Sequence, residues 1–111
     1  MGKIDYDQLL KDCLDITRNH LQNAYNSAKP FAEHSIKQFA EDAVFLANLN
    51  RIGEIDDNEF KHRMENQKLA LANVFLAVKG IGLVEAQNVV NSVLGLISKA
   101  ILGGLNIALP I

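Results

Sequence analysis

Apolar residues recur along most of this chain at intervals of three and four positions, the spacing of an amphipathic α-helix. The first such segment follows Asp5, which precedes Gln8 by the three positions of a capping box. Ile4 and Leu9 take the flanking positions of a hydrophobic staple. We therefore expect a first helix from Asp5 to about Asn26. Its apolar stripe consists of Tyr6, Leu10, Cys13, Thr17, Leu21, Ala24 and Ala28.

The segment from Asn26 to Pro30 predicts a break in the helical pattern. Asn26 and Ser27 compete for backbone hydrogen bonds, and Pro30 suits the first position of a second helix. The alternative is one long helix that Pro30 kinks. Gly53 predicts the end of this helix, because glycine readily adopts a left-handed conformation. The second stripe comprises Ala32, Ile36, Phe39, Ala40, Ala43, Leu46 and Ala47.

A third helix is predicted to begin as the first one does. Asp56 is the cap, Glu59 stands three positions later, and Ile55 and Phe60 form the staple. The sequence Lys79-Gly80-Ile81 indicates its end. Its inward stripe is Phe60, Met64, Gln67, Leu71, Val74 and Val78.

A fourth helix is predicted over residues 83–102, with Gly103-Gly104 ending it. The polar positions Glu85, Asn88, Ser92 and Lys99 fall on one narrow stripe, and apolar residues fill the rest of the circumference. One face of each helix can enter the core of a four-helix domain. A second apolar face is then left over, and such a face usually marks a partner surface. It carries Leu69, Leu76, Val89, Leu96 and Leu102.

In residues 105–111 the spacing of apolar residues changes from three or four positions to two. Leu105, Ile107, Leu109 and Ile111 alternate with other residues, as in an extended segment that presents one apolar side. We expect an arm over 105–111 that lies in an apolar groove of its own or of a neighbouring chain. The predicted fold is all-α: a single helical domain, 1–104, in a four-helix bundle-like arrangement of two helical hairpins, with an extended apolar C-terminal arm.

Composition narrows the classes of function. The chain of 111 residues carries a formal charge of −2, which argues against a strongly basic nucleic-acid binder. One cysteine excludes a disulfide framework and a cysteine-rich zinc site. The polar start predicts no signal peptide, and no stretch of 18 uncharged apolar residues predicts an ordinary membrane-spanning helix. We expect a location in the cytoplasm or within an intracellularly assembled particle.

Candidate catalytic or metal-binding residues are few. Glu59 and His62 form one Glu-x-x-His step, whereas a di-iron bundle needs two such steps and two further glutamates. His20 and His34 have no partner at a ligand spacing, and Cys13 lies on the inward stripe as a small buried residue. The prediction is a protein that is no enzyme and that has no metal or cofactor.

The segment from Val78 to Val90 resembles the helix-hairpin-helix motif of DNA-repair and recombination proteins. It shares the Gly-Ile-Gly turn, an alanine four positions after the second glycine, and a following apolar pair. The resemblance implies that the backbone N–H groups of Gly80 and Gly82 would contact a DNA phosphate, largely without reading sequence. Lys79 is the one basic residue near the turn, and Glu85 is acidic.

The pattern as a whole predicts a non-enzymatic structural or interaction protein that self-associates, or binds a protein partner, through residues 69–111. The expected interface residues are Leu69, Leu76, Val89, Leu96, Leu102, Ile107 and Leu109. One alternative is a membrane-active protein that inserts the hydrophobic hairpin 69–102. The other is the non-sequence-specific DNA binding that the helix-hairpin-helix resemblance implies.

Overall fold

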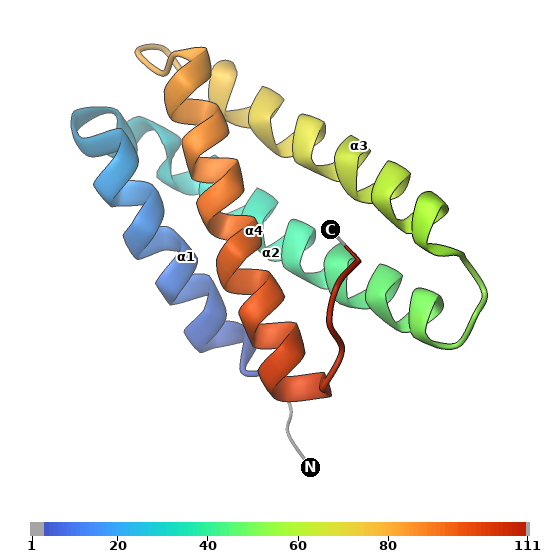
Figure 1. Ribbon diagram of the computed structural model, residues 1–111. Coiled ribbons are helices and arrows are strands. Elements are labelled where there is room, and N and C mark those ends of the chain that lie inside the picture. Colours follow the sequence, from blue (N-terminus) through green and yellow to red (C-terminus); the bar gives the residue numbers. More distant parts are fainter. Residues whose placement is uncertain (1–3, 111) are drawn as a thin grey trace.

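The computed structural model describes residues 4–110, and within this range the chain forms helices and no strand. This confirms the predicted all-α fold. Figure 1 shows the helices packed lengthwise against one another. In chain order they are α1 (Tyr6–Leu21), the short 3-10 helix η1 (Gln22–Ala24), α2 (Tyr25–Arg51), α3 (Asp57–Leu76) and α4 (Leu83–Leu105).

Each α-helix packs against the next one along the chain, and α4 returns to pack against α1 (Figure 1). The ring of helices is therefore closed by the pairing of the first helix with the last. Helix α4 also approaches α2 across the bundle, so it has neighbours on three sides. This position explains why α4 is apolar over most of its circumference.

The predicted helix starts at Asp5 and Asp56 are confirmed. The side-chain oxygen Oδ1 of Asp5 accepts a hydrogen bond of 3.1 Å from the backbone N–H of Gln8. In the same way, Oδ1 of Asp56 accepts one of 2.7 Å from the backbone N–H of Glu59. Each cap satisfies a backbone donor that has no partner within its own helix.

The predicted stop at Gly53 is also confirmed, and it takes the form of a Schellman motif. Gly53 has a φ of +82°, which favours glycine. Its N–H donates to the carbonyl of Asn50 at 3.2 Å, and the N–H of Glu54 donates to the carbonyl of Leu49 at 2.9 Å. Ile55 and Phe60 are both buried directly after this turn, as the staple predicts.

The predicted break at residues 26–30 is wrong. Helix α1 ends at Leu21, the break lies at η1, and Pro30 lies inside α2. The turn arises at Gln22, whose φ of +46° cannot continue an α-helix. Pro30 removes only the bond to the carbonyl of Asn26, and Asn26 is exposed, so water can replace that bond.

The predicted end of the last helix at Gly103-Gly104 is wrong as well, because α4 continues to Leu105. Asn106 ends it with a φ of +57°, and its N–H donates to the carbonyl of Leu102 at 3.0 Å. The arm after Asn106 is non-helical and turns back along the bundle (Figure 1). Ile107 is buried in the core of its own chain, whereas Ile111 lies outside the described residues.

The core is continuous along the bundle. Every residue of the stripe predicted for the second helix is buried. On α3, Phe60, Met64 and Leu71 are buried as expected, but Gln67 and Val74 are only half-buried and Phe75 is fully buried instead. Val78, predicted for the same stripe, lies beyond the end of α3 and is half-buried. The α4 contribution consists of Ala86, Val89, Val90, Val93, Ile97 and Ile101.

Candidate interaction surface

Nine large hydrophobic side chains of the described residues are exposed, and five of them lie on α3 or α4. Leu69 and Leu76 lie on α3, and Leu102 lies near the end of α4. Leu83 and Val84 form the start of α4, where the connection from α3 arrives. We name these five residues the α3–α4 apolar surface. The exposed fractions of Val84, Leu69 and Leu102 are 66%, 59% and 52%.

Three of the seven predicted interface residues belong to this surface, namely Leu69, Leu76 and Leu102. Leu96 and Leu109 are half-buried and pack against the core of the chain itself. The predicted exposure of Val89 is wrong, because this side chain is fully buried. Ile107 is likewise buried, with an exposed fraction of 8%.

The reason for this correction is the pairing of α4 with α1. A shallow groove between the two helices is lined by Leu9 of α1 and by Leu96 and Ala100 of α4, which places this side of α4 against α1. Part of the second apolar face of α4 is therefore covered within the chain. Only the sector opposite the core remains exposed.

That exposed sector of α4 follows a regular spacing. It contains Val84, Asn88, Asn91, Gly95, Ser98 and Leu102, at alternating steps of four and three positions. All six are exposed except Ser98, which is half-buried. A Cβ atom built on Gly95 would meet no atom within 4 Å, so the space beside this glycine is open. We name these six residues the outer seam.

One polar contact between α1 and α4 was not expected from the sequence. The Nε2 atom of His20 lies 2.9 Å from the hydroxyl oxygen of Ser92, and both side chains are half-buried. The flank position of His20 and the polar stripe of α4 were visible in the sequence. Their pairing was not, because it depends on how α1 and α4 turn toward one another.

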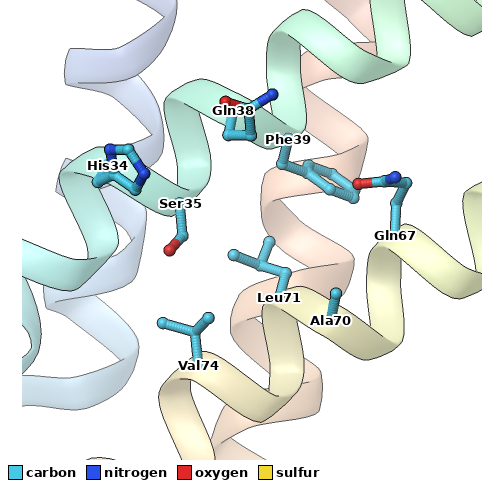
Figure 2. A pocket seen from close by; sticks show the side chains of 8 residues that line it. All are labelled: His34, Ser35, Gln38, Phe39, Gln67, Ala70, Leu71 and Val74. Atoms are coloured by element: carbon cyan, nitrogen blue, oxygen red, sulfur yellow. The ribbon is translucent and has the colours of Figure 1, made fainter.

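A pocket of about 210 Å³ lies between α2 and α3, and Figure 2 shows the side chains that line it. Phe39, Leu71 and Val74 form its apolar part, with Ala70 beside them. Polar side chains come from His34, Ser35, Gln38 and Gln67. His34 is the one titratable group of this lining, so the pocket offers an apolar hollow with polar neighbours and no acid–base pair.

The other sequence candidates for chemistry are separated from one another. Among residues 4–110 no group of three or more His, Cys, Asp or Glu side chains could hold a metal ion. Glu59 forms an ion pair with Arg63 at 2.8 Å, and His62 is exposed. Burial, assisted by the carboxylate of Asp12, raises the pKa of the Cys13 thiol to about 12. Cys13 is thus a protonated core residue at neutral pH.

The two glycines of the helix-hairpin-helix resemblance lie in the connection between α3 and α4. Gly80 has a φ of +93°, and Gly82 is the N-cap of α4. Both are exposed, as is Lys79. The carboxylate of Glu85 folds toward Gly82, since an oxygen of Glu85 would lie 2.7 Å from a Cβ atom at that position. An acidic group therefore stands beside the amides that would meet a phosphate.

Helix α4 is long and apolar enough to cross a membrane by length and composition, with a mean hydropathy of 1.4 over 18 residues. The sequence expectation of no ordinary membrane-spanning helix rested on the charges of Glu85 and Lys99, which this measure tolerates. The core helix of a soluble protein meets the same criterion. Comparison with protein-family models, with curated proteins and with solved structures finds no match for this chain.

Proposed function

We propose that this protein is a non-enzymatic interaction protein that self-associates through α3 and α4. The observation that supports the proposal is the α3–α4 apolar surface, which places five exposed large hydrophobic side chains on two neighbouring helices. Single exposed hydrophobic residues are common on folded proteins. Here five of them gather on two adjoining helices, at both ends of α4 and along α3, which indicates an interaction site. A second copy of the same chain is the simplest partner, because most oligomers are symmetric.

The strength of such an association follows from the area that it covers. Burial of apolar surface contributes about 25 cal/mol per Å². Several hundred Å² would therefore favour association by roughly 10 kcal/mol before the entropic cost of joining two chains is subtracted. After an association cost of about 4 kcal/mol or more, at most about 6 kcal/mol remains, which corresponds to a dissociation constant of tens of micromolar or above.

The arm has a different role in this proposal than the sequence predicts. Because Ile107 is buried in its own chain and Leu109 packs there too, we assign the arm to the stability of the protomer and not to a clasp between copies. The proposed location stays in the cytoplasm or within an intracellularly assembled particle.

Sedimentation velocity over a concentration series tests the proposal. The native chain is expected to form a dimer at tens of micromolar, and Leu102→Asp to shift it to the monomer, since Leu102 is 52% exposed. Phe45→Asp is the matched control, since Phe45 is 62% exposed but lies on α2. The proposal fails if the native chain is a monomer throughout, or if both substitutions act alike.

Membrane insertion is the second candidate, and the hydropathy of α4 favours it. Insertion would require the hairpin 69–102 to leave the bundle, so Val93 and Ile97 would exchange the protein core for lipid. Vesicles of mixed neutral and anionic lipid, loaded with a fluorescent dye, test this candidate. Dye release at a protein concentration that gives a stable dimer in solution would support it, and intact vesicles would contradict it.

A further inference from the structure

We propose that two copies of this chain pair through α4 in antiparallel orientation along the outer seam, with Glu85 of each copy facing Lys99 of the partner subunit. The inference rests on the proposed self-association and specifies its geometry. It draws on three observations: the spacing of the seam, the space at Gly95, and the placement of the two charges on α4.

The seam has the four-three spacing of a coiled-coil contact, with apolar residues at its two ends and polar or small residues between them. Alternating steps of four and three positions keep one line of side chains facing a partner helix along the whole length. This line runs over six positions from Val84 to Leu102, on the side of α4 opposite the buried Val93 and Ile97. Val84 and Leu102, at the two ends of the seam, are more than half exposed.

In the antiparallel pair, a twofold axis passes midway between Asn91 and Gly95. It places each seam residue of one copy opposite a seam residue of the other. The spacing is the same when read from either end, so the first position meets the last one of the other copy. Val84 then packs against Leu102 of the partner subunit, which joins two apolar side chains at each end. Asn91 meets Gly95 of the partner subunit, where the open space beside the glycine accommodates the amide.

The charges of α4 select this orientation. Glu85 and Lys99 are its only charged residues, and fourteen positions separate them, which is about 21 Å along a helix. Neither takes part in an ion pair within residues 4–110. Each directly follows a seam position, Val84 and Ser98 respectively, so both lie on the same flank of the seam.

In an antiparallel pair with a twofold axis perpendicular to both helices, the same flank of each copy lies on the same side of the contact. Glu85 of one copy then lies within about 3 Å, along the helix axis, of the level of Lys99 of the partner subunit. The dimer therefore gains two symmetric ion pairs. A parallel pairing places these flanks on opposite sides of the contact, so the same charges gain nothing. The charge complementarity thus points to a second copy as the occupant of the seam.

Charge exchange tests the proposed pairing. We expect Glu85→Lys, or Lys99→Glu, to raise the dissociation constant of the dimer about tenfold, since each change replaces two attractions by two repulsions. The double variant Glu85→Lys/Lys99→Glu is expected to return to within about threefold of the native value. Glu54→Lys is the matched control for net charge, because Glu54 is exposed in the turn after α2.

Thermal unfolding is measured for each variant, so that an effect on the stability of the protomer is separated from an effect on the dimer. Asp5 and Asp12 line the same groove as Lys99, so Lys99→Glu also affects the protomer. Glu85→Lys affects it as well, because it removes a carboxylate from the first turn of α4. A dimer that Glu85→Lys leaves unchanged, or that the double variant fails to restore, would overturn the antiparallel seam while self-association stands. A native chain that stays monomeric would overturn both proposals.

Distances between spin labels provide an independent measurement. Labels at Leu83→Cys are expected about 30 Å apart along the dimer, and labels at Gln87→Cys about 18 Å apart, at two exposed positions outside the seam. The native Cys13 is buried and stays unlabelled in the folded protein. Equal distances at both positions would indicate a parallel dimer and contradict the inference.

Discussion

The Nε2 atom of His20 on α1 lies 2.9 Å from the hydroxyl oxygen of Ser92 on α4, so a hydrogen bond joins the first and last helices of the bundle. A hydrogen bond of this kind contributes about 1 kcal/mol to stability. We therefore expect Ser92→Ala to lower the free energy of unfolding by about 1 kcal/mol. Urea denaturation followed by circular dichroism measures the change.

Ser98→Ala is the control for this prediction. Ser98 is a half-buried serine of the same helix, and the substitution changes helix propensity by the same amount. It is expected to leave stability unchanged or slightly raised. A loss of equal size in both variants would show that the bond to His20 contributes nothing.

The Cys13 thiol predicts a dependence of stability on alkaline pH. Its pKa is raised from 9.0 to about 12 in the folded chain, chiefly by burial. Between these values the unfolded chain loses the thiol proton while the folded chain keeps it, so the free energy of unfolding falls as pH rises. Tyrosines and lysines titrate in the same range. The contribution of the thiol is therefore the difference in the pH dependence of the free energy of unfolding between the native chain and a variant without the thiol.

Cys13→Ala is that variant. We expect it to be less stable than the native chain at pH 7, because it leaves a small cavity, and to lose less stability between pH 8 and 11. Urea titrations at each pH give the slope of the free energy of unfolding against pH for the native chain and for Cys13→Ala. Parallel slopes would mean that the thiol does not titrate differently in the two states.

Gln22 offers a stabilising substitution. Its φ of +46° with a ψ of −111° lies in a region that favours glycine. We expect Gln22→Gly to raise the free energy of unfolding by about 1 kcal/mol, after the greater flexibility of glycine in the unfolded chain is subtracted. Thermal unfolding detects this as a higher midpoint.

The neighbouring Asn23→Gly is the matched control, because Asn23 is exposed and has no positive φ. It is expected to lower the unfolding midpoint. If Gln22→Gly were also destabilising, the turn between α1 and α2 would not have the backbone conformation described here.

Ile107 connects the arm to the core, and its removal is expected to weaken the protomer. Ile107→Ala should lower the free energy of unfolding by roughly 2 kcal/mol, as for an isoleucine at the edge of a core. The exposed neighbour Ala108 is the control, since Ala108→Ser should change little. The proposed role of the arm also requires that Ile107→Ala keep the native dimer at concentrations where it is folded; a monomer would instead assign the arm to the interface.

Local signals predicted much of the fold. The caps at Asp5 and Asp56 and the stop at Gly53 depend on side-chain and backbone geometry within a few residues, so their prediction from sequence was correct. The stripe of α2 was also correct, because this helix buries one regular face. Pro30 was misplaced because Asn26, whose carbonyl would have accepted its hydrogen bond, is an exposed residue, so the helix tolerates the proline.

The candidate surface was predicted less well, for a physical reason. Helical periodicity shows which residues of a helix share a face, but not how many other helices surround that helix. Val89 is buried because α1 packs on a side of α4 that seemed free when only one buried face was assumed. Leu69 and Leu102, which no helix covers, remained where the pattern placed them.

The closure of the bundle by α4 also bears on how the chain is made. Translation produces α1, α2 and α3 first, while the side chains that fill the centre, among them Val93 and Ile97, arrive last. The nascent chain therefore exposes a hydrophobic interior until α4 has left the ribosome. Because α1 can pair with α4 only then, the bundle cannot close while α1, α2 and α3 alone are outside the ribosome.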